Sequence, residues 1–383
     1  MEDDVDHPTG LSIKGWPRFR HDNRNSGSTP AIVGTMPTLQ WKKGPFGTTL
    51  NSGKAMASGP VIARDGTIIV GGGDNDGMQG VLWALNGAGS TQWTFAGKRG
   101  YGYAQPAIRV DGTSYYSTQD GTAYAVDSTG LKKWNYSFGS QDDCSPIVTR
   151  DGLVIYGSDT GELFTLDADG KLKWQSDKAT GPGEVDAALA ESCEGLIVAG
   201  GQNGWVGLNA KTGKTQWKVA ATGGLHALMS SPLVSAAGIV YGADSGGQVV
   251  AIDLQGKLLW SKQVASGGGG TSLAKIGPQL FVVLADGKLH ALNAATGQEN
   301  WAKPVGQQAE MYRHGGPVVD GAQRIYFNSS DGYVYAFDTA GTPLWKLAAS
   351  GQSLSGTSFA EMAIADDGTL LVPGNDGLLY AFQ

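Results

Sequence analysis

Short apolar runs alternate with polar, glycine-rich turns along almost the whole chain, and the same arrangement recurs many times. A representative copy is residues 332–345, where the run Tyr-Val-Tyr-Ala-Phe leads into an Asp-Thr-Ala-Gly turn and then into a short run ending at tryptophan. Alternating residues predict a strand with two different faces, and the turn between the two runs predicts a hairpin. Near-copies occupy residues 80–93, 121–134, 161–174, 204–217, 247–260 and 287–301.

Two further strands are predicted ahead of each hairpin. The first often begins at a proline, as at Pro60, Pro146 and Pro317, a position where a strand tolerates the missing N–H. An Asp-Gly turn such as Asp151-Gly152 then leads into a second short apolar strand. Four strands in a repeat of about 40–45 residues predict one blade of a β-propeller.

The number of repeats predicts the number of blades. Seven hairpins are complete, whereas residues 377–383 hold only the first half of a hairpin and Leu39-Gln40-Trp41 only the second half. Joining the halves predicts an all-β, eight-bladed β-propeller of four-stranded antiparallel blades, closed by an N-terminal strand around Trp41 that completes the C-terminal blade. We expect one propeller domain at residues 39–383. One structural tryptophan per blade is expected to fill the wedge between neighbouring sheets: Trp41, Trp93, Trp134, Trp174, Trp217, Trp260, Trp301 and Trp345.

Residues 1–38 precede the first repeat and form an N-terminal extension that we expect to pack on the propeller. They contain a cluster of large and charged residues, Trp-Pro-Arg-Phe-Arg-His-Asp, at residues 16–22. This cluster is either a binding surface or a peptide that packs Trp16 and Phe19 against the propeller and covers its rim. We favour the packing interpretation, because aromatic rings in an extension more often bury themselves than stay exposed.

Composition supports many short strands joined by tight turns. Glycine is abundant, at 60 residues, and only 16% of residues are charged. The net charge of −7 and the lack of a Lys/Arg cluster argue against nucleic acid or an anionic membrane surface as a partner. No apolar run is long enough for a transmembrane segment. The acidic start does not resemble a secretory signal, so we expect either a cytosolic protein or an exported one whose signal has been removed.

The two cysteines predict neither a disulfide framework nor a zinc site, since no Cys-x-x-Cys pair or histidine cluster accompanies them. In the predicted blades, Cys144 precedes an innermost strand and Cys193 follows the far end of the next innermost strand. A bridge between them is therefore not expected.

Candidate functional residues lie where the repeat is interrupted, just before each innermost strand. The chain enters every innermost strand on one face of the ring, here called the mouth, where a ligand would bind. An equally simple interpretation is that any wide propeller mouth is polar and solvated. The candidate ligand-binding residues are Tyr101, Tyr103, Asp142, Asp143, Glu184, Asp186, His226, Met229, Tyr312, Arg313, His314, Phe359 and Glu361.

The mouth combines two chemical characters. Carboxylates on adjacent blades, Asp142, Asp143, Glu184 and Asp186, could hold a hard cation or act as an acid/base pair. Aromatic and basic residues on the other side suit a protein segment, a sugar or another polar small molecule. Single histidines such as His226 and His314 are more often hydrogen-bonded loop residues than ligands, and His290 is expected to be packed. No catalytic residue and no metal site is assigned.

The repeat Tyr-Ala-x-Asp-x-x-x-Gly-x-x-x-Trp, as in residues 124–134 and 335–345, resembles the pyrroloquinoline-quinone (PQQ) repeat of quinoprotein-like eight-bladed propellers. The resemblance covers about residues 39–383, and Trp16, Asp22 and Gly27 resemble the segment before the first blade in such proteins. The family includes quinoprotein alcohol dehydrogenases and a propeller lipoprotein of outer-membrane barrel assembly. It implies a periplasmic or extracellular protein.

The non-dehydrogenase branch, which includes the assembly lipoprotein, is the better match. The dehydrogenases carry adjacent cysteines against the quinone and a calcium held by Glu and Asn, whereas Cys144 and Cys193 lie far apart in this sequence. PQQ and calcium are therefore disfavoured and no cofactor is expected. We predict a monomeric, non-catalytic binding or scaffold propeller that recognises a protein segment or a polar small molecule at its mouth. The alternative is an enzyme that uses the acidic cluster, either a quinone- and calcium-dependent oxidoreductase or an acid/base enzyme on a carbohydrate or small metabolite.

Overall fold

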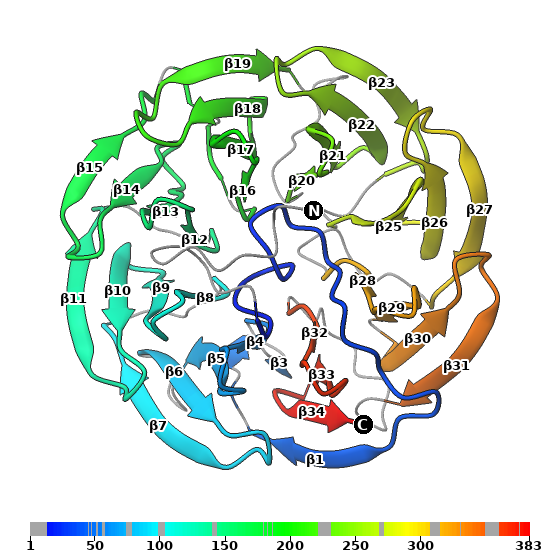
Figure 1. Cartoon of the computed structure of the whole chain (residues 1–383), viewed down its shortest axis with the longest axis horizontal. Coiled ribbons are helices and arrows are strands. Elements are labelled where there is room, and N and C mark those ends of the chain that lie inside the picture. Colours follow the sequence, from blue (N-terminus) through cyan, green and yellow to red (C-terminus); the bar gives the residue numbers. More distant parts are fainter. Residues whose placement is uncertain are drawn as a thin grey trace.

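Eight four-stranded antiparallel sheets form a closed ring in the computed structural model (Figure 1), which confirms the predicted fold class. The described part of the chain contains no helix, and thus none long and apolar enough to cross a membrane. The described residues are 14–44, 46, 48–50, 53–55, 58–73, 79–98, 104–139, 144–178, 180–181, 183–185, 187–220, 231–267, 272–306, 315–329, 331–348, 360–374 and 376–383.

Each blade runs outward from a short strand at the central channel. The innermost strands of blades 1 to 8 are β4 (Val61–Ile62), β8 (Ala107–Ile108), β12 (Ile147–Val148), β16 (Ala190–Glu191), β20 (Leu233–Val234), β24 (Ala274–Ile276), β28 (Val318–Val319) and β32 (Ala363–Ile364). The second strands are β5 (Ile68–Gly73), β9 (Ser114–Thr118), β13 (Val154–Tyr156), β17 (Leu196–Gly201), β21 (Ile239–Ala243), β25 (Gln279–Val283), β29 (Ile325–Asn328) and β33 (Leu370–Pro373).

The third and fourth strands form the hairpin that the sequence repeat predicts. The third strands are β6 (Gly80–Leu85), β10 (Thr122–Val126), β14 (Phe164–Leu166), β18 (Gly204–Asn209), β22 (Gln248–Asp253), β26 (Lys288–Asn293), β30 (Tyr333–Phe337) and β34 (Leu379–Phe382). The fourth are β7 (Thr91–Ala96), β11 (Lys132–Ser137), β15 (Leu172–Gln175), β19 (Thr215–Val219), β23 (Leu258–Gln263), β27 (Glu299–Pro304), β31 (Pro343–Ala348) and β1 (Leu39–Lys43). A separate hairpin joins β2 (Thr48–Leu50) to β3 (Gly53–Ala55).

The ring closes as the two half-hairpins predict. β1 pairs antiparallel with β34, with Trp41 opposite Ala381 and Lys42 opposite Tyr380. Thr38 and Gln383 extend this pairing, since the N–H of each donates to the carbonyl of the other at 2.8 and 3.0 Å. Blade 8 is therefore assembled from both ends of the described chain, and no loose edge remains between the first and last blades.

A small residue lies opposite the repeat tryptophan on the third strand of every blade. The opposite residue is alanine in six blades, Thr165 in blade 3 and Gly207 in blade 4. A Cβ added to Gly207 would lie 2.2 Å from the Trp217 ring. This explains why the sequence repeat conserves a small residue between larger ones: the indole needs the space.

Seven of the eight repeat indoles also attach their blade to the next one. In seven blades the indole N–H donates to a carbonyl in the hairpin turn between the third and fourth strands of the following blade. The pairs are Trp41–Gly87 (2.8 Å), Trp93–Ser128 (2.9 Å), Trp134–Ala168 (2.8 Å), Trp174–Ala210 (2.9 Å), Trp217–Leu254 (2.8 Å), Trp260–Ala294 (3.0 Å) and Trp301–Thr339 (3.0 Å).

Trp345 is the exception, and the topology gives the reason. Its indole Nε1 is buried without a hydrogen-bond partner among the described residues. The acceptor would lie in a turn joining the third and fourth strands of blade 8, but those strands are β34 and β1, which are not consecutive in the chain. Closing the ring with strands from opposite ends of the described chain therefore leaves one indole without its acceptor.

Glycine in the hairpin turn is required by close contact with the preceding indole. At Gly170, φ is +78°, and an added Cβ would lie 2.7 Å from the Trp134 ring. We expect Gly170→Ala to destabilise the protein by about 2–4 kcal/mol, from left-handed strain and overpacking together. Gly66→Ala is the matched control, because φ there is +84° but no atom lies within 4 Å. It should lose only about 1 kcal/mol in urea unfolding; equal losses would contradict a contact role.

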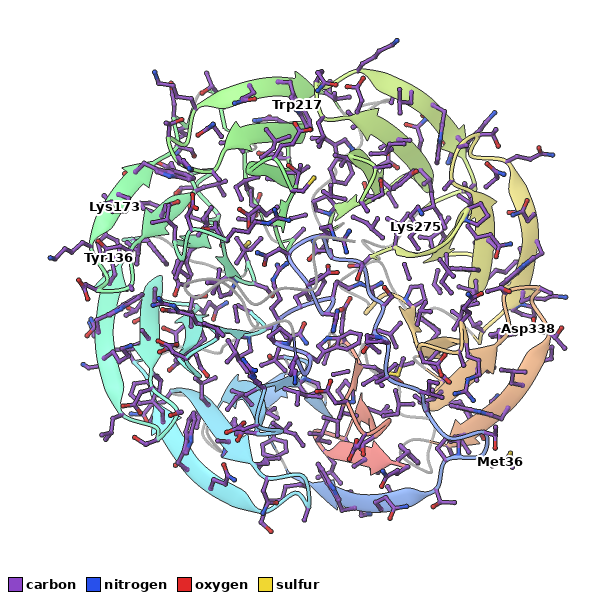
Figure 2. The ribbon with its side chains drawn as sticks, in the orientation of Figure 1. Met36, Tyr136, Lys173, Trp217, Lys275 and Asp338 are labelled. Atoms are coloured by element: carbon purple, nitrogen blue, oxygen red, sulfur yellow. The ribbon has the colours of Figure 1, made fainter. Side chains whose placement is uncertain are left out.

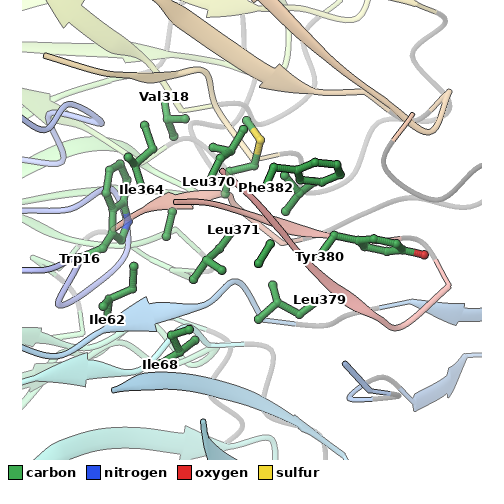
Figure 3. Close-up of a cluster of buried hydrophobic side chains, with 14 of the residues drawn as sticks. Trp16, Ile62, Ile68, Val318, Ile364, Leu370, Leu371, Leu379, Tyr380 and Phe382 are labelled. Atoms are coloured by element: carbon green, nitrogen blue, oxygen red, sulfur yellow. The ribbon is translucent and has the colours of Figure 1, made fainter. Parts of the chain in front are cut away.

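Apolar side chains fill the wedges between blades. Figure 2 shows side chains packed throughout the ring, with Lys173 and Met36 on its outer rim. The cluster around blade 8 contains Trp16 from the N-terminal extension, whose ring lies beside Ile62 and Ile364 (Figure 3). The extension therefore contributes to the hydrophobic core.

Candidate functional site

Residues 14–33, here called the axial segment, cross the centre of the ring before the chain runs outward to β1 (Figure 1). Backbone hydrogen bonds join Trp16 to Ile62 in both directions, at 2.9 and 2.7 Å. The contacts lie mainly at the last residues of the innermost strands, at the end of the channel opposite the mouth, which we call the base. The backbone of the segment therefore lies at the base end of the channel, whereas the side chains of Arg18 and Arg20 reach carbonyls that precede the innermost strands on the mouth side.

Hydrogen bonds connect the axial segment to all eight blades. For blades 1 to 4 the partners include Trp16–Ile62, Pro17–Ile108, Asn23–Val148 and Arg18–Leu189. For blades 5 to 8 they include Arg24–Val234, Arg20–Leu273, Gly27–Val319 and Gly15–Asp366. One short segment thus connects strands that lie more than 300 residues apart in the sequence.

Arg20 is one of two fully buried arginines in the axial segment. Its side chain is fully buried, and its Nη2 donates to the carbonyls of Leu273 and Pro317, both at 2.6 Å. Its Nη1 lies 3.5 Å from Glu361 Oε1, and both side chains are at most 1% exposed. Gly27 passes against the guanidinium, where an added Cβ would lie 2.0 Å from Nη2. Burial raises the pKa of Glu361 above its ordinary value, and Arg20 opposes that rise.

Arg18 makes a second polar cluster on the same segment. Its Nη1 donates to the Asp22 carbonyl and to Asn25 Oδ1, both at 2.9 Å, and its Nη2 donates to the Leu189 carbonyl. Asn25 in turn donates to the carbonyls of Leu189 and Pro232. Burial lowers the pKa of Arg18 to about 10, so the guanidinium stays charged at neutral pH.

Glu191, on β16, links the axial segment to blades 3 and 4. Its Oε2 accepts from Asn23 Nδ2 at 2.9 Å and from the Arg150 N–H at 3.2 Å. Burial raises the pKa of Glu191 to about 7. The folded protein therefore holds this proton more tightly than the unfolded chain, so its stabilising effect is complete below about pH 4.5 and is lost as the pH rises through 7.

We expect Glu191→Gln to flatten this pH dependence. At pH 8.5 the variant should be more stable than the wild type by up to about 3 kcal/mol, and at pH 4.5 the two should be equal. Urea unfolding at several pH values measures the difference. Glu194→Gln, at an exposed position in the next turn, should leave the wild-type pH profile unchanged. A constant difference between Glu191→Gln and wild type across this range would contradict the titration.

Only two of the residues proposed for the mouth lie in the described part of the chain. Glu184 is half-buried, and its carbonyl accepts from the Gln202 N–H at 3.1 Å. Glu361 is 2% exposed and turns toward Arg20 and the Gly316 N–H, which donates to its Oε1 at 3.0 Å. The candidates outside the described residues are Tyr101, Tyr103, Asp142, Asp143, Asp186, His226, Met229, Tyr312, Arg313, His314 and Phe359.

The axial polar residues were not among the sequence candidates. Arg18 and Arg20 lie in the cluster at residues 16–22 that the sequence marks as unusual, Asn23 and Asn25 follow it directly, and Trp16 is buried. Phe19 is only half-buried. The sequence signal that could have identified these residues is the spacing Arg-x-Arg-x-x-Asn-x-Asn beside tryptophan and glycine. Such a spacing does not show which of the side chains are buried.

Other titratable groups have structural partners. His290 is 2% exposed, and its ring nitrogens lie 2.8 Å from Glu299 and 3.0 Å from Asp286. It occupies the repeat position of Tyr335, which donates to the equivalent Asp331. Cys144 is buried, Cys193 is exposed, and neither forms a disulfide within the described residues.

The described residues do not match a quinone and calcium site. No group of three or more His, Cys, Asp and Glu side chains within them is arranged to hold a metal ion. Cys144 is buried, and its Sγ lies 3.0 Å from the Ala187 carbonyl, so it packs between blades.

The family whose sequence model matches is described as outer membrane protein assembly factor BamB, and it matches residues 77–206, 143–279 and 268–383. These overlapping matches follow from the repeat and together span most of the ring. The assembly factor BamB of Vibrio cholerae serotype O1 is 28% identical over 145 residues, which are 35% of this chain and 38% of that protein. The matched region is thus less than half of that relative's length.

Solved structures show the same fold at low identity. BamB from Moraxella catarrhalis superposes with a TM-score of 0.70 at 19% identity, over 91% of this chain and 98% of that one. Quinohemoprotein alcohol dehydrogenase from Comamonas testosteroni gives 0.75 at 15% identity, over 99% and 82%. At such identities the likeness establishes the architecture alone, which is shared by a named assembly factor and a named dehydrogenase.

Proposed function

The chain belongs to the family described as outer membrane protein assembly factor BamB, and we propose that it is a non-catalytic scaffold that binds other proteins during outer membrane assembly. The family match over residues 77–383 carries this proposal, because it spans most of the ring. This protein binding would take place in the periplasm, on the inner side of the outer membrane.

The geometry of the channel supports a binding function at the mouth. The backbone of the axial segment lies across the base end, where it hydrogen-bonds to the last residues of several innermost strands, so a ligand would enter from the opposite face. The names of the matched family and relatives favour a protein segment over a sugar or another polar small molecule as that ligand. The mouth candidates of the sequence analysis stay proposals for this contact.

Deleting the gene in its native host tests the proposal. We expect the deletion strain to contain less folded β-barrel protein in its outer membrane, measured by heat-modifiable mobility on gels, and the wild-type gene should restore the amount. Unchanged barrel levels in the deletion strain would contradict an assembly role. As a separate check on the enzymatic alternative, the purified protein with PQQ and calcium should show no dye-linked oxidation of alcohols or sugars.

A further inference from the structure

The outer edge of each blade is a strand with one unpaired side, because the fourth strand pairs only with the third. Such an edge exposes backbone N–H and C=O groups and can accept a further strand from another chain. Proteins commonly prevent this with lysine or proline on the edge strand. The eight outer strands differ in whether they carry these protecting residues.

Seven of the eight outer strands carry lysine, and one does not. The protecting lysines are Lys42 and Lys43 on β1, Lys132 and Lys133 on β11, Lys173 on β15, Lys218 on β19, Lys262 on β23, Lys303 on β27 and Lys346 on β31. β7, with the sequence Thr-Gln-Trp-Thr-Phe-Ala, has neither a charged residue nor a proline. The edge of blade 1 is thus the unprotected one.

β7 is also held by its own pairing and packing. It pairs with β6 from Val81–Ala96 to Leu85–Thr91, with one bulge at Gln92. On the side facing blade 2, Phe95 packs edge-on against Tyr116 and Tyr124, with ring centroids 6.1 and 5.5 Å apart. Four of its six residues are exposed, and the remaining two, Trp93 and Phe95, are half-buried.

A groove on the base face begins beside β7 and runs between blades 1 and 2. It has a volume of about 470 Å³, and its lining includes Trp93, Arg64, Asp65, Arg109 and Asp111. Arg109 Nη1 and Lys133 Nζ both approach the same carboxylate oxygen of Asp111, at 3.8 and 3.9 Å. The lining itself carries two arginines, Arg64 and Arg109, and two carboxylates, Asp65 and Asp111. Lys133 beside Asp111 therefore leaves a local excess of one positive charge on an otherwise acidic protein.

We propose that β7 is the docking edge for an extended segment of a partner protein, which adds to blade 1 as a fifth strand and places an acidic side chain in the groove between blades 1 and 2. Backbone hydrogen bonds along β7 hold the segment, and Arg109 selects the acidic residue beside it. This inference rests on the proposed function, because it assigns the surface and the form of the protein partner.

Thr94→Lys tests the edge directly. Thr94 is exposed and follows the repeat tryptophan, the position at which blades 4, 7 and 8 have Lys218, Lys346 and Lys42. The probe is a fluorescein-labelled peptide, Asp-Thr-Val-Thr-Val-Thr-Asp, titrated with the purified full-length protein and followed by fluorescence anisotropy. We expect saturable binding that Thr94→Lys weakens at least tenfold with an unchanged thermal midpoint.

The matched control is Gln175→Lys, which adds the same charge at the same repeat position of blade 3. It should change the affinity less than twofold. Arg109→Gln should weaken binding of the Asp-ended peptide to the level of an Asn-ended peptide. Binding should also slow hydrogen exchange at residues 91–96 at least fivefold, and no other outer strand should respond.

Several outcomes would overturn the proposal. They are absence of binding to the wild type, equal affinity in Thr94→Lys, or exchange protection elsewhere on the ring. Self-association of the wild type that Thr94→Lys abolishes and the peptide does not displace would assign the edge to a second copy of this chain instead. These results are independent of barrel-protein levels in a deletion strain, so failure of this docking edge and failure of the assembly role are distinguishable.

Discussion

Arg20→Ala is expected to destabilise the propeller by about 3–5 kcal/mol, because it leaves Glu361 buried without its cation and removes the donor to two carbonyls. Arg20 contacts blades 6, 7 and 8 at once, so the loss is shared by three interfaces. Urea-induced unfolding followed by tryptophan fluorescence measures the change in free energy. A loss below about 1 kcal/mol would contradict the role assigned to the buried guanidinium.

Two further variants separate this effect from a general loss of charge. Arg24→Ala removes the same residue type four positions on, where the side chain is 24% exposed and 3.7 Å from Asp22. It should change the free energy of unfolding by less than about 0.5 kcal/mol. Adding Glu361→Gln to Arg20→Ala should recover part of the loss, because the unpaired buried carboxyl is then removed.

Deleting residues 1–45 is expected to abolish cooperative thermal unfolding. The deletion removes β1, the outer strand of blade 8, and with it the axial segment that hydrogen-bonds to all eight blades. Blade 8 would then expose the edge of β34, and the base of the channel would lose the buried Trp16. Differential scanning calorimetry measures the transition. A melting curve like that of the wild type would contradict the closed ring.

A synthetic peptide of residues 14–45 provides the control for this deletion. The contacts of this segment with the ring are all non-covalent: hydrogen bonds and one strand pairing. We therefore expect the separate peptide, mixed with the truncated protein, to restore a cooperative transition. A peptide with Arg20→Ala and Trp16→Ala should restore it less well. Equal rescue by both peptides would show that β1 alone accounts for closure.

The blades of this protein and their number could be predicted from the sequence because every blade repeats the same residue pattern. Tryptophan opposite a small residue, an Asx-x-x-Gly turn and two complementary half-hairpins each reflect a packing requirement that every blade must meet. The missing indole partner of Trp345 could not be predicted so easily. It follows from the non-consecutive strands of blade 8, which the repeat itself does not encode.

The axial segment could be only partly predicted. Its residues follow no period, and the partners of Arg18 and Arg20 are mainly backbone carbonyls of distant strands, which no side-chain pattern marks. Glu361 illustrates the same limit. Its position before an innermost strand follows from the repeat, but its burial against Arg20 depends on a segment about 340 residues away in sequence. The remaining mouth residues stay predictions.

Binding of the purified protein to the detergent-solubilised outer membrane assembly complex of its host tests the scaffold proposal most directly. The measurement is biolayer interferometry with the propeller immobilised and the complex titrated. The proposal predicts saturable binding with one propeller per complex, and weaker binding by the Thr94→Lys variant if β7 is the docking edge. No binding at tens of micromolar complex would contradict a scaffold role in outer membrane assembly.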